Sequence, residues 1–456
     1  MSQEKNTFGG RFRRYARVGA GVGAYAARRA GRRVMGGDSS RERDAAELKA
    51  ALGGLKGPIM KLAQTMATIP DAVPTEYAAA FATLQTNAPP MGWPFVRRRM
   101  RAELGPDWQS RFKSFEHEAA AAASLGQVHR AVSLDGRRLA CKLQYPDMQS
   151  AVEADLRQLR LIFSIYRRMD PAIDPSEVGE EVGARLREEL DYAREAAHMR
   201  LYRTLLAAVP GIRVPEVLGE VSTPRLLTMT WLDGRPILEY KSASQDVRNR
   251  LSELLFKAWW QPLSQCAVIH GDPHLGNYSV WEEDGGMGLN LLDFGCVRIF
   301  PPKFMKGVIE LYHAIRREDR EAMVAAYESW GFRNLSNALI DALNIWARFI
   351  YGPLLDDRVR TVADGVSPAE YGRREAFEVH RQLKEHGPVT PPREFVFMDR
   401  AAIGLGAVFL HLQAELNFYR LFNEAISDFD IDEVAAAQGA ALDAAGVPPR
   451  ADMEAI

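Results

Sequence analysis

Cysteine is scarce in this sequence. The 456 residues contain three, Cys141, Cys266 and Cys296, and no two of them form a CxxC pair. An odd and scattered set of cysteines supports neither a disulfide framework nor a thiolate zinc site. We therefore expect a protein of a reducing compartment, and the cytoplasm is the expected location.

Long apolar runs and an excess of one charge are also missing. No window approaches the roughly 20 charge-free apolar residues of a membrane span, and arginines interrupt the apolar stretches where a signal peptide would lie. The 58 Lys and Arg residues nearly balance the 59 Asp and Glu residues, giving a net charge of −1. No overall field therefore favours nucleic acid, and we expect no nucleic-acid partner.

What is present is the composition of an ordinary folded protein. The shares of 47% hydrophobic and 26% charged residues exclude a disordered or collagen-like chain. At roughly 100–200 residues per domain, the length suggests two to four structural units. Nothing in the sequence indicates an oligomeric state.

The N-terminus concentrates positive charge. Between residues 11 and 33 it carries eight arginines and no acid: Arg11, Arg13, Arg14, Arg17, Arg28, Arg29, Arg32 and Arg33. One interpretation is a basic helix on an anionic lipid surface, which would add a peripheral contact at the inner face of the membrane. The other is a soluble basic arm. The residues leave both open.

Periodicity predicts an α+β protein that is predominantly helical. Apolar residues recur at helical spacing from Leu55 to Ile69, with Lys61 and Gln64 off that stripe. An Asp135-Gly136 turn between two apolar segments predicts a β-hairpin. Residues 246–268 and everything beyond Pro302 read as helix, and Leu289 to Leu292 reads as a buried strand that ends at Asp293. We predict a basic arm at 1–50, a helical extension at 51–110, a β-containing lobe with inserted helices at 111–232 and a helical lobe at 233–456.

The most informative stretch runs from Val268 to Val280, followed by Asp293-Phe294-Gly295. It places Asp272, Asn277 and Asp293 in the order H-x-D-x-x-x-x-N then D-F-G, which is typical of kinase-type phosphoryl transfer. That chemistry needs an acid near the nucleophile, and an amide and a carboxylate that hold magnesium. Asp272 fits the first role, and Asn277 with Asp293 fits the second.

This stretch has two other interpretations. Each residue alone could build a turn or end a strand. Alternatively, His270, Asp272 and His274 could bind zinc, although Pro273 disfavours the continuous helix on which two histidines four apart share one face.

Phosphoryl transfer also needs a cation for the phosphates and an acid that holds it. Lys142 lies in a strand-like segment and is the candidate, although a strand lysine can also point to solvent. Upstream, five alanines from 119 to 123 favour helix by propensity, whereas a kinase places a glycine-rich loop here, and Gly126 alone meets that pattern.

Glu189 and Glu195 are the candidate acids. Six residues apart on a predicted helix, they would point about 120° away from each other and so face different partners. One could pair with Lys142 and the other could meet Lys61. A solvated charged face is the plain alternative.

Together these motifs resemble the UbiB/AarF-domain atypical kinase family, over about 52–422. The likeness rests on K-x-G-Q (61–64), the alanine-rich S-x-G-Q-V-H (124–129), Lys142, E-L-D-Y-x-x-E-A (189–196), H-x-D-P-H-x-G-N (270–277), D-F-G (293–295), and Asp399-Arg400-Ala401 followed by Gly404-Leu405. The resemblance implies a bilobal protein-kinase-like fold whose N-terminal helical extension packs across the active site.

The resemblance further implies ATP and Mg²⁺ as cofactors and a function in lipid or isoprenoid-quinone (ubiquinone) metabolism, with partners there. Lys142 would contact the phosphates with Glu195 as its partner, and Lys61 and Gln64 would reach the pocket near Glu189. The implied nucleotide contacts are Ala121, Ala122, Ala123, Ser124, Gly126, Gln127 and Val128 over the phosphates and Met229, Trp231 and Leu232 as the hinge against adenine.

The sequence departs from the family at Ala63, where glycine is usual, which puts the approach of the Lys61 helix in doubt. No Ala-Pro-Glu follows Gly295. The expected activity is that of an atypical kinase or ATPase whose phosphate acceptor the sequence does not identify. The alternatives are a small-molecule phosphotransferase of the aminoglycoside or choline type, which lacks the Lys61/Gln64 helix, and a scaffold that senses nucleotide without turnover.

Overall fold

The computed structural model describes residues 91–122, 125–146, 148–150, 152–153, 156–157, 183, 186–333, 335–363, 365–367, 370–386 and 392–447. The chain forms two compact units, and each is described by itself. The first unit comprises Met1–Asp191 and Thr223–Leu226, and the second comprises Tyr192–Ser222 and Leu227–Ile456. The basic arm and the predicted 55–69 helix, with Lys61, Ala63 and Gln64, lie outside the described residues. The predicted domain limits stay predictions.

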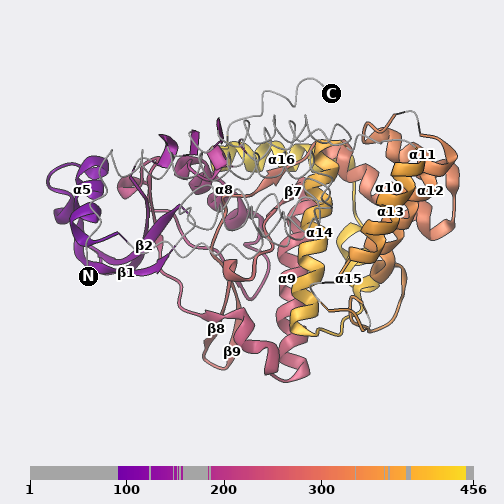
Figure 1. The fold of residues 1–456 in the computed structure, drawn as a ribbon. Coiled ribbons are helices and arrows are strands. Elements are labelled where there is room, and N and C mark those ends of the chain that lie inside the picture. The colour runs from indigo at the N-terminus through magenta and orange to yellow at the C-terminus, as the bar shows by residue number, and fades with distance from the viewer. Residues whose placement is uncertain are drawn as a thin grey trace, which may run out of the picture. The chain divides into compact units, whose positions relative to one another are not determined.

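The first unit is built on an antiparallel sheet (Figure 1). Its strands are β1 (Phe112–Ala122), β2 (Gly126–Ser133) and β3 (Arg138–Gln144), with β2 in the middle. The predicted hairpin is confirmed between β2 and β3, where Gly136 turns the chain with a φ of +89° that side-chain-bearing residues rarely adopt. The segment Thr223–Leu226 continues the sheet beside β3, because the Gln144 amide donates to the Arg225 carbonyl at 3.1 Å.

The alanine run is strand rather than the helix that propensity favours. Ala119, Ala121 and Ala122 pair with His129, Val128 and Gln127 of β2. Helix propensity differs by less than about 1 kcal/mol between most residues, and the pairing with β2 outweighs it, although the register shifts between Ala119 and Ala121. The described part of the alanine run, up to Ala122, therefore belongs to β1.

Helix α5 (Trp93–Leu104) and the 3-10 turn η1 (Trp108–Arg111) precede this sheet. Glu103 of α5, whose side chain is 4% exposed, accepts hydrogen bonds from Arg99 at 3.2 Å and from Thr223 at 2.7 Å, and it forms an ion pair with Arg225 at 3.0 Å. Arg99 also donates to the Gln144 and Tyr145 carbonyls at 3.2 and 3.1 Å. One buried carboxylate thus ties α5 to segment 223–226, and its arginine partner ties α5 to the end of β3.

Short strands of the second unit form two further sheets. The larger one has the order β4-β9-β8-β6, and the smaller one pairs β10 with β7. Their bounds are β4 (Ile212–Arg213), β6 (Arg235–Pro236), β7 (Val268–Ile269), β8 (Tyr278–Glu283), β9 (Gly286–Leu291) and β10 (Arg298–Ile299); β5 (Leu226–Thr230) runs into this unit from the first. The predicted buried strand before Asp293 is confirmed as β9.

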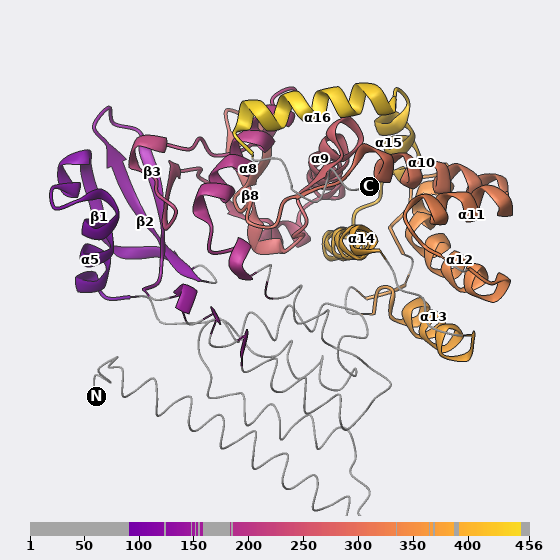
Figure 2. The same ribbon diagram turned by 90° about the horizontal axis from the view of Figure 1, so that it is seen from above.

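Helices make up most of the second unit, and α9 and α14 lie side by side in it (Figure 1). Their bounds are α8 (Tyr192–Leu205), α9 (Gln245–Cys266), α10 (Pro302–Arg317), α11 (Arg320–Ser329), α12 (Asn337–Tyr351), α13 (Arg373–His386), α14 (Arg393–Leu412), α15 (Phe418–Ile426) and α16 (Ile431–Ala445), with 3-10 turns η2 (Gly219–Val221), η3 (Ile237–Ser242), η4 (Leu275–Asn277) and η5 (Gly352–Leu355). Helix α16 packs against both α8 and α9 (Figure 2).

The prediction of a predominantly helical α+β fold is confirmed, including the helices beyond Pro302. Helix α16 also connects distant backbone: the buried Gln438 amide donates to the Cys266 carbonyl at 2.7 Å and to the Phe300 carbonyl at 2.9 Å. Across the described residues, no helix combines the length and apolar character that crossing a membrane requires.

Candidate functional site

The β8–β9 hairpin brings two candidate metal ligands to the same end. Asn277 comes directly before β8, and Asp293 lies two residues beyond the end of β9. Tyr278 pairs with Leu291, and the Leu292 amide donates to the Asn277 carbonyl at 3.0 Å. The antiparallel register therefore joins residues that are sixteen positions apart in the chain.

Asp272 is held at this end by Asn277. The Asn277 amide Nδ2 donates to Asp272 Oδ2 at 3.0 Å and to the Asp272 carbonyl at 3.2 Å. This leaves Oδ1 as the Asn277 side-chain atom suited to a cation, and Asp293 contributes a carboxylate whose Oδ1 accepts from the Gly295 amide at 3.0 Å. Amide and carboxylate oxygens fit Mg²⁺, which takes one or two protein ligands and completes its shell with water and phosphate.

His270 is a core residue. It is 1% exposed and packs among aromatic rings, with centroid distances of 5.7 Å to Tyr202, 5.7 Å to Trp259 and 5.5 Å to Phe294. Burial lowers the pKa of His270, and the carboxylates of Asp272 and Asp293 oppose that shift. The His270 imidazole is therefore a neutral part of the core, and its packing positions the loop that follows it.

The alternative zinc interpretation finds no cluster to support it in the described part of the chain. No group of three or more His, Cys, Asp or Glu side chains there is placed to hold a metal ion. His274 instead accepts a hydrogen bond from the Gly276 amide at 3.0 Å, which caps η4.

Close backbone contacts fix the loop that carries Asp272. Gly271 has a φ of +76°, and a Cβ there would lie 2.3 Å from the Cys296 carbonyl oxygen. A Cβ on Gly404 of α14 would lie 2.1 Å from Pro273 Cγ. Only glycine at these two positions lets the chain segments come this close. The loop is therefore packed tightly between α14 and the segment after Asp293.

Helix α8 places Glu195 and His198 one turn apart in the core, 2% and 1% exposed. His198 Nδ1 contacts the Phe294 carbonyl at 3.2 Å, which links α8 to the Asp293-Phe294-Gly295 segment. The sequence patterns did not single out His198. Its position three residues after Glu195, about one turn along a helix, could have predicted that the two side chains share a face.

The prediction that Glu189 and Glu195 share one helix is wrong. Residues 189 and 190 form a turn, closed by hydrogen bonds from the amides of Leu190 and Asp191, and α8 begins at Tyr192. The helical angle between the two acids therefore does not apply.

Lys142 lies on β3 of the first unit, paired with Val128 of β2. Ala121 and Ala122 end β1 and Gly126 begins β2, so the strands bring these predicted nucleotide contacts to one end of the hairpin. Ala123 and Ser124 lie outside the described residues.

Gln127 has a structural task. Its side chain is fully buried, accepts from the Met91 amide at 2.6 Å and donates to the Met91 carbonyl at 3.3 Å. It also contacts His129 Nε2 at 2.7 Å, and His129 Nδ1 contacts the Glu116 carbonyl at 2.9 Å. Burial lowers the pKa of His129, consistent with a neutral ring in this network. Any contact of Gln127 with a nucleotide would therefore fall to its backbone.

The predicted hinge lies where β5 ends. Met229 is buried within β5 and bridges Val217, whereas Trp231 and Leu232 follow the strand and are half-buried. The Trp231 indole donates to Asp233 Oδ1 at 3.0 Å.

Comparison with known proteins gives a family match over more than half of the chain. A model described as the ABC1 atypical kinase-like domain matches residues 83–327. Among curated proteins, the chain is 30% identical over 283 residues to the Arabidopsis thaliana Protein ACTIVITY OF BC1 COMPLEX KINASE 8, chloroplastic, covering 60% of this chain and 37% of that protein.

The match to Atypical kinase coq-8, mitochondrial, of Caenorhabditis elegans is 26% identical and covers 86% of this chain and 52% of that protein. The chain thus spans between about a third and about a half of the length of these two relatives. Among solved structures, the complex of Rv3197 with erythromycin from Mycobacterium tuberculosis aligns with a TM-score of 0.59 and 28% identity, over 84% of this chain and 96% of that chain.

Proposed function

Because this chain belongs to the ABC1 atypical kinase-like family, we propose that it binds ATP with Mg²⁺ and transfers or hydrolyses the terminal phosphate. One observation carries the proposal: Asp272, Asn277 and Asp293 are gathered by the β8–β9 register and the Asp272–Asn277 hydrogen bond. Phosphoryl transfer depends on positioning and charge neutralisation, so this arrangement meets its main requirement.

Each of these side chains has a role in the proposal. Asn277 and Asp293 hold Mg²⁺, which supplies positive charge against the phosphate oxygens. Asp272 orients the attacking hydroxyl or water and accepts its proton; the Asn277 amide holds the carboxylate in place for this task. Lys142 binds the phosphates with Glu195 as its acidic partner, and Lys61 and Gln64 reach the nucleotide near Glu189.

Nucleotide binding is tested by thermal unfolding with and without Mg²⁺-ATP. Ligand at a hundred times its dissociation constant should add about 2.7 kcal/mol of stability to the wild type. Asp293→Asn should lose most of that gain, because it removes the charge while keeping an acceptor for the Gly295 amide.

The matched control is Asp284→Asn at the far end of the same hairpin. Asp284 is exposed and has a φ of +50°, which asparagine tolerates, so this variant should respond to Mg²⁺-ATP like the wild type. A wild type whose unfolding is unmoved by Mg²⁺-ATP would refute nucleotide binding. A shift without phosphate release would instead identify a nucleotide sensor.

We further propose that this activity serves isoprenoid-quinone or lipid metabolism, as the resemblance to the UbiB/AarF family implies, with quinone-biosynthesis proteins or an anionic lipid surface as partners. Quinone levels in a deletion strain test this: an unchanged level would remove the quinone assignment. Dependence of phosphate release on anionic vesicles, lost when the eight N-terminal arginines are neutralised, tests the lipid contact.

A second candidate is phosphate transfer to a small hydroxylated molecule. The similar Mycobacterium tuberculosis protein was solved with erythromycin, a macrolide with several hydroxyl groups. If this chain uses such acceptors, erythromycin should raise ATP consumption and gain a phosphate detectable by mass spectrometry. ATP consumption unaffected by erythromycin would leave hydrolysis or a different acceptor class.

A further inference from the structure

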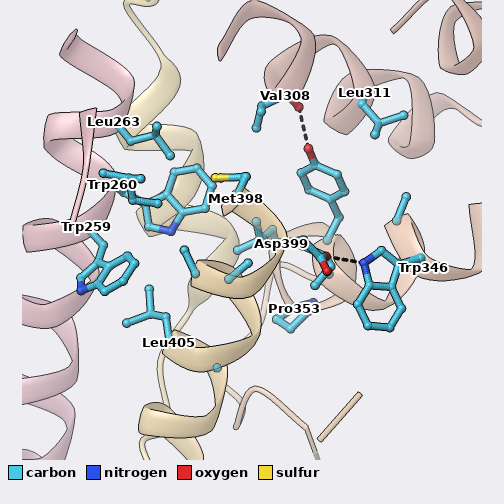
Figure 3. A pocket seen from close by; sticks show the side chains of 18 of the residues that line it. Trp259, Trp260, Leu263, Val308, Leu311, Trp346, Pro353, Met398, Asp399 and Leu405 are labelled. Atoms are coloured by element: carbon cyan, nitrogen blue, oxygen red, sulfur yellow. Dashed lines mark hydrogen bonds between the residues drawn. The ribbon is translucent and has the colours of Figure 1, made fainter. Parts of the chain in front are cut away.

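The second unit contains a cavity of about 110 Å³ among its helices (Figure 3). Trp259 and Trp260 come from α9, Val308 from α10, and Trp346 from α12; α14 contributes residues including Leu405. Other aromatic and aliphatic side chains complete a predominantly apolar wall. An apolar cavity of this order stays dry and takes up small apolar molecules.

The polar groups in this wall mostly have partners within the protein. The Tyr351 hydroxyl donates to the Val308 carbonyl at 2.8 Å, and the Tyr327 hydroxyl donates to Asn344 at 2.9 Å. The Trp330 indole donates to the Phe304 carbonyl at 3.0 Å. These groups are therefore engaged in holding the helices together.

Asp399 is the one carboxyl group among the residues that line the cavity. It is half-buried. Its Oδ1 accepts from the Trp346 indole (Figure 3), and among the described side chains no donor reaches Oδ2. A buried carboxyl group without a full set of hydrogen bonds is costly, so a partner inside the cavity would lower that cost.

Asp399 can bind both hydrogen-bond donors and acceptors, because both of its protonation states are present near neutral pH. Burial raises its pKa to about 7, and the hydrogen bond from Trp346 only partly opposes that shift. Near neutral pH the group is therefore present both as an acid that donates a hydrogen bond and as a carboxylate that accepts one. A ligand hydroxyl can serve as the partner of either form, and a ligand carbonyl can accept from the acid.

We propose that this cavity is a binding site for a compact apolar molecule, of about the size of one aromatic ring, that carries a single hydroxyl or carbonyl group against Asp399. The ring packs among the tryptophans of α9 and α12, and the oxygen meets Oδ2. The site lies in the helical part of the second unit and does not depend on the proposed nucleotide activity.

The test compares benzyl alcohol with toluene, measured by ligand-observed NMR titration without nucleotide. The two probes share a ring and differ by the hydroxyl group. Wild-type protein should bind benzyl alcohol more tightly than Asp399→Leu does, by about three- to tenfold, the effect of one hydrogen bond. Toluene should bind the variant at least as well as the wild type, because leucine keeps the wall apolar.

Two further variants locate the site. Asp399→Asn keeps an acceptor for Trp346 and a donor toward the cavity, so it should retain benzyl alcohol binding. Ala347→Leu, which adds carbons into the cavity from α12, should weaken both probes at least tenfold. Circular dichroism and thermal unfolding establish that each variant is folded before it is compared.

Three results would contradict the proposed binding site. If neither probe binds wild-type protein at millimolar concentrations, the cavity is a packing void and the proposal is wrong. Binding that Ala347→Leu leaves unchanged would place the probes elsewhere and also overturn it. Benzyl alcohol affinity unaffected by Asp399→Leu would remove the hydroxyl contact, and with it the assigned ligand class.

Discussion

At the scale of single residues, a substitution at Asp272 should separate nucleotide binding from turnover. Its carboxylate is positioned by Asn277, which is itself a proposed metal ligand. Asp272→Asn preserves size and a side-chain oxygen for that hydrogen bond but can no longer accept a proton. We expect phosphate release to fall by about 10²- to 10⁴-fold, while the thermal shift with Mg²⁺-ATP stays close to that of the wild type.

Steady-state phosphate release and thermal unfolding, measured on the same preparations, check this prediction. A loss of nucleotide binding as large as the loss of turnover would place Asp272 among the binding groups instead. Full activity in the variant would exclude it from catalysis.

The Glu103 carboxylate connects several segments of the first unit, so its substitution tests how much that connection stabilises the fold. Its 4%-exposed side chain accepts hydrogen bonds from Arg99 and Thr223 and forms an ion pair with Arg225. Glu103→Gln removes the charge that balances the buried Arg99, so the free energy of unfolding should fall by about 1–3 kcal/mol. Urea denaturation measures this.

Glu116→Gln is the comparison for Glu103→Gln. Glu116 lies 3.9 Å from Arg130, and both side chains are more than half exposed. Removing that exposed pair should change stability by less than about 0.5 kcal/mol. Equal effects of the two substitutions would contradict the central role given to Glu103.

At the scale of elements, helix α14 packs closely at Gly404 against Pro273, in the loop that carries Asp272. A methyl group there would overlap Pro273, so Gly404→Ala must push the helix and the loop apart. We expect a loss of about 1–3 kcal/mol in stability and a fall in phosphate release. Thermal unfolding and activity assays measure the two effects.

Gly439→Ala on α16 provides a matched control, because an added methyl group there meets nothing within 4 Å. Alanine should stabilise that exposed helical position by up to about 1 kcal/mol. If Gly404→Ala were as harmless as Gly439→Ala, the contact between α14 and Pro273 would not govern the loop.

The sequence predicted individual elements well where pattern and turn chemistry agreed. Asp135-Gly136 predicted the β2–β3 hairpin, and the apolar run before Asp293 predicted β9. It failed where local propensity and long-range pairing disagree, as in the alanine run of β1. It also failed at Glu189, where a turn interrupts the acidic segment before α8.

The residues proposed for the candidate site could be chosen from the sequence. The contacts that hold these residues in place could not. The spacing of Asp272, Asn277 and Asp293 carries the chemistry in the sequence itself. The contact of His198 with the Phe294 carbonyl, and that of Gly404 with Pro273, join residues about a hundred or more positions apart. Such contacts arise only when whole helices pack together, so no local sequence pattern predicts them.

At the scale of the whole molecule, buried ionisable groups set how stability depends on pH. Because burial raises the pKa of Asp399 from 3.8 to about 7, the folded state binds a proton that the unfolded state has released across that interval. The stability that Asp399 contributes is therefore present below about pH 4 and is lost as the pH rises toward 7. The tyrosines lining the same cavity, Tyr327, Tyr351 and Tyr371, stay neutral because burial raises their pKa values.

Asp399→Asn removes this dependence while keeping the acceptor for Trp346. The variant should gain stability relative to the wild type as the pH increases from about 4 to 8, by at most about 4 kcal/mol. Urea unfolding of both proteins at matched pH values gives the difference directly, which cancels the opposite effect of the buried histidines. A difference independent of pH would show that Asp399 titrates normally.

The Gln438 side chain of α16 has a consequence for how the chain is made. It hydrogen-bonds to backbone carbonyls on both sides of the segment that holds Asp272, Asn277 and Asp293, yet it is synthesised about 140 residues after the later of those three. At roughly 5–20 residues per second, a ribosome needs several seconds to cover that distance. Nascent chains halted before α16 should therefore expose this segment to protease. The candidate site is therefore completed only once α16 has been synthesised.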